Sequence, residues 1–209
     1  MGRKLIYTLT LLAYTQFTKA QETTPAYETG NAFNYKGILS AQATLATGYN
    51  TAFRSINYFL HGNLEYQLDQ RISVRSDIYY FLNSKTPSDN VEPFAYQHGL
   101  FTGAQYHFLK GKLDWYAGIQ PGLIFGLRQY DQLMMVDGSA NPLESPKKNV
   151  AACFSFNTGI NYYASKFFYL FLHARHNTGW FSDNYSVASL NEFRGSFGLG
   201  FYLRVWKPK

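Results

Sequence analysis

A period-two alternation of side chains runs through residues 55–82, SINYFLHGNLEYQLDQRISVRSDIYYFL. Every second position forms a largely apolar row, made up of Ile56, Tyr58, Leu60, Gly62, Leu64, Tyr66 and Leu68, and then Ile72, Val74, Ser76, Ile78, Tyr80 and Leu82. Successive side chains of a β-strand point to opposite faces, so this period predicts strands and not a helix. Residues 56–68 and 72–82 are predicted to form two long strands joined at Asp69 and Gln70.

The length of these segments decides the kind of sheet. Strands in soluble proteins average about five or six residues, whereas a strand that crosses a bilayer needs about 9–11. The second row carries Glu65, Arg71, Arg75 and Asp77. Charged side chains facing lipid near the midplane cost about 2–4 kcal/mol each. The two strands are therefore predicted to be a transmembrane β-hairpin with its charges turned toward a polar lumen.

The remaining chain repeats this pattern. Aromatic residues make up 19% and charged residues 15%, against about 25% charged in ordinary soluble domains. Further alternating segments lie at residues 36–48, 94–108, 113–128, 150–163, 167–176 and 192–205. Tight turns follow the second, fourth and sixth strands, and polar connections occupy 83–93, 129–149 and 177–191. The sequence predicts an all-β fold, an eight-stranded antiparallel up-and-down transmembrane β-barrel over residues 36–206. Pro121 lacks a ladder donor and precedes Gly122, so we expect a bulge or kink there.

The N-terminal segment has the features of a secretory signal peptide. Arg3 and Lys4 precede an apolar stretch, and small residues Thr18 and Ala20 stand before Gln21. We expect residues 1–20 to be the signal peptide, with an N-terminal helix as the alternative. Residues 21–35 are expected to be a periplasmic lead-in with little structure, and 207–209 a C-terminal tail. Three of the positive charges behind the formal net charge of +6 lie in the signal segment, and a secreted barrel has no access to nucleic acid, so no nucleic-acid partner is expected.

Nine charged residues share the polar parity of their strands and are expected to form a charge network in the lumen: Glu65, Arg71, Arg75, Asp77, Asp114, Arg128, Arg175, Arg194 and Arg204. An eight-stranded barrel is just wide enough for its own side chains to fill it. Six of the nine are arginines, so the lumen is expected to carry excess positive charge. A closed ion-pair network is the favoured reading, and a narrow anion-preferring pore is the alternative.

The C-terminal segment FRGSFGLGFYLRVW alternates aromatic residues with small or basic ones and precedes Lys207-Pro208-Lys209. Here the mature chain resembles the small eight-stranded outer-membrane β-barrels, the family of outer-membrane protein X and the OmpA transmembrane domain. The resemblance implies a location in the cell outer membrane of a Gram-negative envelope and recognition of the last strand by the barrel-assembly machinery. It is architectural and does not specify an activity.

No residue pattern indicates catalysis. A lipid A deacylase of the small-barrel type would place Ser two residues after a strand His, and none of the five histidines has one. His98 and His176 are interpreted as interfacial polar residues, and Cys153 as a buried, inert thiol. No metal-ligand cluster or nucleotide motif is recognised, so neither a metal nor a cofactor is expected.

The longest connection contains four consecutive apolar residues, Leu133, Met134, Met135 and Val136. They are expected either to pack on the barrel mouth or to contact a protein partner. The favoured function is a non-enzymatic integral outer-membrane β-barrel, structural or an accessory subunit of an outer-membrane protein complex, in contact with membrane lipid, lipopolysaccharide and other outer-membrane proteins. The alternatives are a lipid A-modifying enzyme and the narrow anion-preferring pore.

Overall fold

Each long strand alternates between buried and exposed side chains, as β2 illustrates along its whole length. The structure is a computed structural model, and it describes residues 35–86, 94–110, 112–128, 149–165, 167–182 and 187–205. The predicted signal peptide, residues 21–34 of the lead-in, the apolar segment 133–136 and the tail 207–209 lie outside the described residues.

The described strands are β1 (Ile38–Asn50), β2 (Ser55–Gln67), β3 (Ile72–Lys85), β4 (Phe94–Lys110), β5 (Leu113–Arg128), β6 (Asn149–Tyr162), β7 (Phe168–Ser182), β8 (Val187–Ser189) and β9 (Glu192–Arg204). All except β8 have 13 to 17 residues. This length exceeds the 9–11 residues or so that a tilted strand needs to cross a bilayer.

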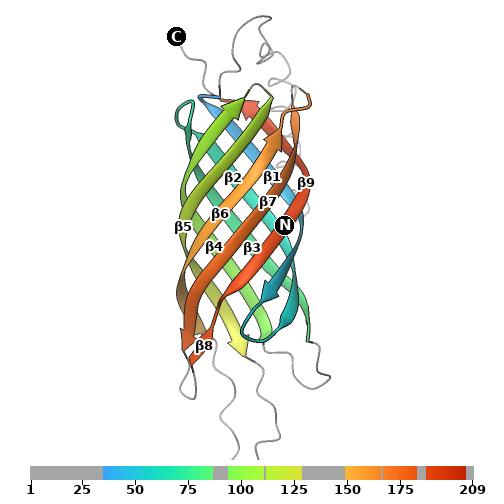
Figure 1. Cartoon of the computed structure of the whole chain (residues 1–209), viewed down its shortest axis with the longest axis vertical. Helices are drawn as coiled ribbons and strands as arrows, with labels where there is room; N and C mark the ends of the chain where they lie inside the picture. Colours follow the sequence, from blue (N-terminus) through green and yellow to red (C-terminus); the bar gives the residue numbers. More distant parts are fainter. Residues whose placement is uncertain are drawn as a thin grey trace, which may run out of the picture.

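The long strands form one closed barrel (Figure 1). Each pairs antiparallel with the long strands next to it in sequence, and β9 returns to pair with β1 from Ile38↔Arg204 to Asn50↔Glu192. The short strand β8 pairs only with the end of β7 in the described residues. The predicted eight-stranded up-and-down barrel is therefore confirmed.

The two ends of the barrel differ in their connections. We call the end that carries the β2–β3, β4–β5 and β6–β7 connections the turn end. The opposite end, which carries the β1–β2 turn and β8, is called the loop end, and it is the lower end in Figure 1. Outer-membrane barrels have short periplasmic turns and longer extracellular loops, so the turn end is the expected periplasmic side.

The predicted polar loop at 177–191 is wrong in its first half. Strand β7 continues to Ser182, and its alternation persists, with Asn177 and Gly179 inward and Thr178 and Trp180 outward. Trp180 then faces Ser189 of β8 across a short hairpin. Residues 177–182 are rich in polar residues and were therefore predicted as a loop, but they extend β7 toward the loop end of the barrel.

Pro121 does not produce the expected bulge. Phe101 pairs with Gly122 and Ala104 with Ile119, so β4 and β5 keep one register across the proline. The described ladder between them lapses opposite Gln120 and Pro121, where proline has no N–H to donate. On the other side Pro121 pairs in register with Phe154 of β6. Register shifts occur elsewhere, at Tyr58 and Phe59 between β2 and β3 and at Phe94 and Tyr96 between β4 and β5.

The outer wall is an apolar band. Every long strand exposes at least one large apolar side chain, and one from each is Leu45, Leu60, Ile78, Leu100, Ile119, Phe154, Leu172 and Phe197. Two pairs of polar groups on this face bind each other: Ser76 and Thr102 hydrogen-bond at 3.0 Å, and Trp115 Nε1 donates to Thr158 Oγ1 at 2.9 Å. An exposed apolar surface of this extent around a whole barrel is the surface that a bilayer covers.

Small inward residues make room for tyrosines. Gly200 of β9 lies opposite Tyr169 of β7, and a Cβ at Gly200 would fall 2.6 Å from the Tyr169 hydroxyl oxygen. Tyr169 cannot easily yield, because it is buried and its ring packs against Phe171, Tyr163 and Tyr202. The inward glycine is therefore a packing requirement of the turn end.

We expect Gly200→Val to destabilise the barrel by about 1–3 kcal/mol, because an added side chain overpacks a filled interior. The matched control is Gly195→Val on the same strand, since Gly195 faces outward and a Cβ there meets nothing within 4 Å. Urea unfolding in lipid vesicles measures both. Equal unfolding free energies for the two variants would contradict this packing.

Candidate functional site

Asp77 of β3 is the centre of the barrel interior. Its side chain is fully buried and accepts hydrogen bonds from Arg75 Nε at 3.0 Å, Arg175 Nη2 at 2.7 Å and Gln120 Nε2 at 2.9 Å. His61 Nε2 lies 2.8 Å from Asp77 Oδ1. One carboxylate thus ties together inward side chains of β2, β3, β5 and β7.

A second carboxylate cluster lies closer to the turn end. His107 of β4 stands between two acids, with Nε2 3.0 Å from Glu65 Oε1 and Nδ1 2.8 Å from Asp114 Oδ2. Ser73 Oγ donates to Glu65 at 2.5 Å, and Asn161 Nδ2 donates to Asp114 at 3.2 Å. All five side chains are buried.

Arg75 and Tyr116 connect the two clusters. Arg75 Nη1 donates to the Tyr116 hydroxyl at 2.8 Å and lies 3.7 Å from Glu65 Oε2. The same hydroxyl lies 2.9 Å from His173 Nδ1. Tyr116 reaches this position because Gly159, its cross-strand partner on β6, has no side chain to obstruct it. The two clusters therefore form one continuous network through the middle of the barrel.

Toward the loop end, Arg194 pairs with Glu192 on the same strand. Arg194 Nε donates to Glu192 Oε2 at 2.7 Å, and Asn57 Nδ2 donates to Glu192 Oε1 at 2.6 Å. The guanidinium lies 4.1 Å from the ring centre of Phe59 and 4.7 Å from that of Tyr79. Glu192 was not among the predicted lumen residues, although it opens the predicted strand 192–205 and shares the inward parity of Arg194.

Aromatic side chains close both ends of the network. At the loop end, buried rings are contributed by Phe59, Tyr79, Phe81, Phe94 and Phe101. At the turn end, the buried rings are those of Tyr35, Tyr163, Tyr169, Phe171 and Tyr202.

Tyr35 departs from the expectation of an unstructured lead-in. Its side chain is only 1% exposed and packs edge-on against Tyr163 at 5.3 Å between ring centres. Its backbone N–H donates to Gln70 Oε1 at 3.2 Å. Burial raises the pKa of Tyr35 and of Tyr163, so both hydroxyls stay neutral at physiological pH. Tyr35, the first described residue, is therefore part of the aromatic cluster at the turn end.

The structure separates the nine predicted lumen residues. Six are buried together: Glu65, Arg75, Asp77, Asp114, Arg175 and Arg194. Arg71 is not among them, because it precedes β3 in the turn, is exposed, and donates to the Tyr106 hydroxyl at 3.1 Å on the outer wall. Arg204 is half-buried near the end of β9, and the side chain of Arg128 lies outside the described part of the structure.

The fully buried charges of the described interior are close to balance, whereas an excess of positive charge in the whole lumen, which would include Arg128 and Arg204, stays a prediction. The buried charged residues with Glu192 included are three arginines and four carboxylates. This count differs from the predicted one because Arg71 lies outside, Glu192 lies inside, Arg204 is only half-buried, and the side chain of Arg128 is not described. The interior is an approximately balanced ion-pair network, which is what a low-dielectric interior favours.

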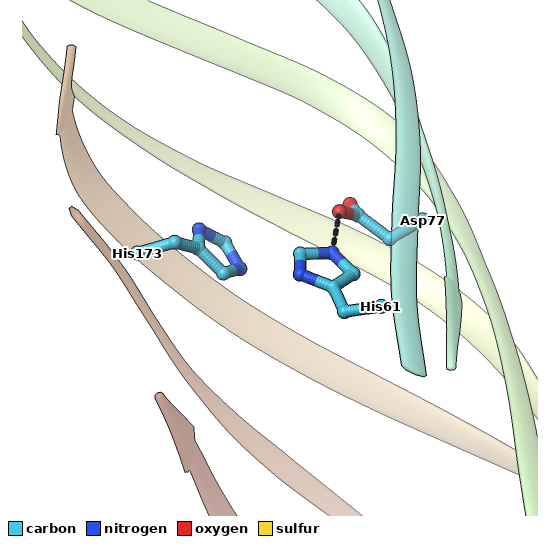
Figure 2. A group of neighbouring side chains, drawn as sticks. All are labelled: His61, Asp77 and His173. Carbon is cyan, nitrogen blue, oxygen red and sulfur yellow. Dashed lines mark hydrogen bonds and ion pairs between the residues drawn. The ribbon is translucent and has the colours of Figure 1, made fainter. Parts of the chain in front are cut away.

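His61, Asp77 and His173 are close enough to be considered as a metal site (Figure 2). One ligand atom from each lies within 4.8 Å of the others. The oxygens of Asp77, however, already accept from two arginines, Gln120 and His61. A divalent cation would have to displace these donors and approach two guanidinium charges. The arrangement favours an ion-pair centre over a metal centre.

Both candidate catalytic histidines lie on the wall and not in the interior. His98 stacks between Tyr80, at 4.5 Å, and Tyr96, at 5.1 Å, and His176 lies 4.4 Å from the Phe193 ring. Among the described residues, no carboxylate pairs with either of them. The interpretation as interfacial polar residues fits this placement. Cys153 is buried against the aromatic cluster at the loop end.

Solved structures share this architecture. The chain is similar to the N-terminal β-barrel domain of Pseudomonas aeruginosa OprF (TM-score 0.54, 14% identity, 80% of this chain and 98% of that one). It is also similar to the outer membrane protein OprG from Pseudomonas aeruginosa (TM-score 0.56, 12% identity, 80% and 96%) and to Neisserial surface protein A (TM-score 0.53, 14% identity, 80% and 96%). The fold is that of the small outer-membrane β-barrels. No protein-family model and no curated protein matches the sequence.

Sequence identities of 12–14% support a shared fold but not a shared activity, ligand or partner. Together with the apolar outer band, the shared barrel supports the predicted location in the outer membrane. No helix among the described residues is long and apolar enough to cross a bilayer.

We expect Asp77→Ala to destabilise the small outer-membrane barrel by about 3–5 kcal/mol, because it leaves Arg75 and Arg175 buried without their counter-charge. The control is Asp69→Ala, since Asp69 is exposed in the β2–β3 turn and a surface substitution changes stability by about 0.5 kcal/mol or less. Urea unfolding followed by tryptophan fluorescence gives both values. A loss for Asp77→Ala no larger than the control would contradict the central role of this carboxylate.

Proposed function

We propose that the protein is a closed, non-enzymatic outer-membrane barrel that serves as a structural or accessory subunit of an outer-membrane complex. The observation that carries this proposal is the filled interior. A network centred on Asp77 occupies the middle, and aromatic clusters occupy both ends. A barrel whose described interior is occupied in this way would act through its outer and end surfaces.

The interior argues against the narrow anion-preferring pore. The three buried arginines each bind a carboxylate within the wall. An anion crossing the barrel would have to displace Asp77 or Glu192 from these arginines. It would also have to part the buried tyrosines at the turn end, which pack within 5.1 to 6.3 Å between ring centres.

We expect the purified protein to show no unitary conductance steps in planar bilayers bathed in concentrated KCl. Each guanidinium and each carboxylate in the described interior has a partner within the barrel, so a permeating ion would have to break these ion pairs. A porin inserted from the same detergent serves as the positive control. Reproducible steps with anion selectivity would support the pore instead.

A lipid A-modifying enzyme is the remaining alternative. His98 and His176 lie at the outer wall toward the loop end, where lipid A would be reached. Their contacts are aromatic stacking, and His98 Nδ1 accepts the Phe81 backbone N–H at 3.2 Å. Neither arrangement activates a nucleophile or a water molecule.

We expect cells that express the His98→Ala/His176→Ala variant to have the same lipid A mass spectrum as cells with the unaltered protein. The comparison includes cells that lack the protein. A lipid A species present only with the unaltered protein would identify an enzyme and overturn the non-enzymatic proposal.

The accessory role predicts a partner in the membrane. We expect affinity purification from detergent-solubilised membranes to recover a second outer-membrane protein in a constant ratio. The apolar residues of the longest connection provide the matched variant, Leu133→Ser/Met134→Ser/Met135→Ser/Val136→Ser. Loss of the partner from this variant would locate the contact, and recovery of the barrel alone would favour a purely structural role.

A further inference from the structure

A shallow hollow of about 300 Å³ lies on the outer wall at the loop end. It is lined by Tyr49, Arg54, Ile56, Lys85 and Thr86. Tyr49 and Ile56 are cross-strand partners, and Ile56 is in turn the partner of Lys85. The hollow therefore crosses the end of β1, the start of β2 and the end of β3, beside the β1–β2 turn. That turn lies at the lower end of the barrel in Figure 1.

The turn that carries Arg54 is held in place by its neighbours. Asn50 Oδ1 accepts the backbone N–H groups of Ala52 at 3.0 Å and Phe53 at 3.2 Å. The backbone N–H of Thr51 donates to the Asn191 carbonyl at 3.0 Å. The Phe53 ring packs edge-on against Phe94 at 5.6 Å. Residues 51–53 of the turn are thus anchored to the barrel mouth, and Arg54, the next residue, lines the hollow on the outer wall.

Arg54 has a left-handed backbone conformation, with φ of 52°. A non-glycine residue adopts this conformation at an energetic cost, and such residues concentrate at functional positions. Its side chain is exposed, as is that of Lys85. Among the described residues, neither cation forms an ion pair with a carboxylate. The hollow thus presents two positive charges on a rigid frame.

The apolar residues of the hollow continue the lipid-facing wall. Tyr49 is 46% exposed and Ile56 41% exposed, and both belong to the outward rows of their strands. Tyrosine at the end of an outward row is typical of the membrane interface. A ligand for this hollow therefore combines a negative group at the polar edge with an apolar part that runs along the wall.

We propose that the hollow binds the phosphorylated headgroup of an outer-leaflet glycolipid, with Arg54 and Lys85 on the phosphate and Tyr49 and Ile56 against the sugar and first acyl carbons. A guanidinium matches phosphate oxygens with two parallel donors, and a lysine adds a point charge. The inference rests on the proposed placement in the outer membrane with the loop end outward.

The experiment compares lipid binding by the full chain in detergent with EDTA present, so that divalent cations do not bridge charges. Diphosphoryl lipid A, fully dephosphorylated lipid A and inorganic phosphate are titrated against the unaltered protein, and thermal midpoints are recorded. We expect only diphosphoryl lipid A to stabilise the barrel. Equal stabilisation by dephosphorylated lipid A or by inorganic phosphate would overturn the proposal.

The variants are Arg54→Gln/Lys85→Gln and, as a control cation at the turn end, Arg71→Gln. We expect the double variant to bind diphosphoryl lipid A roughly tenfold more weakly, as the loss of charge-assisted hydrogen bonds predicts. We expect Arg71→Gln to bind diphosphoryl lipid A like the unaltered protein. Equal losses of affinity in both variants would mean that binding depends on general surface charge and not on this hollow. Heat-modifiable migration on gels reports the folded barrel separately, so a folded double variant with unchanged affinity contradicts this site alone.

Discussion

Lipid cannot satisfy a backbone amide or a charged side chain, and this constraint shapes the whole wall. Each long strand finds partners on both sides, and the ring closes where β9 meets β1. Closure removes the exposed edges that an open sheet would leave in hydrocarbon. The same constraint sends the charged side chains in the middle of the strands inward, where only other protein groups can balance them, whereas Lys85 stays on the outer wall at the end of β3.

The inward charges then become the interior's organising feature. Asp77 balances Arg75 and Arg175, and Glu192 balances Arg194. Stacked rings cover the faces of these guanidiniums: Arg175 lies 4.4 Å from the ring centre of Phe101. Such an interior is stable only when its charged members keep their partners, so the loss of one carboxylate would leave a buried guanidinium without its counter-charge.

Alternation predicted the fold because it is a local property. Parity alone placed Asp77, Asp114 and Arg194 inside, and the structure has them buried. It failed for Arg71, which precedes β3 and lies outside. Glu192 opens β9 and lies inside, as its parity requires, although it was not among the nine predicted lumen residues. Parity cannot locate a strand terminus.

The contacts of the interior were beyond a local pattern. Residues 61, 77, 120 and 175 meet at one point because of barrel closure and the stagger between strands, and neither is visible in a single sequence. The same holds for the tyrosine cluster at the turn end, which unites Tyr35, Tyr163 and Tyr202. The hollow depends on the left-handed backbone conformation of Arg54, which the sequence does not predict for an arginine.

The most direct test concerns the two faces of one strand. Ile119 is outward in β5 and 62% exposed. The protein with Ile119→Trp as its only tryptophan, the natural ones being replaced by phenylalanine, is reconstituted in vesicles that contain lipids brominated at chosen depths. The two-faced barrel predicts strong fluorescence quenching by bromine within the acyl chains. An unquenched tryptophan, or a chain that stays dissolved without detergent, would contradict it.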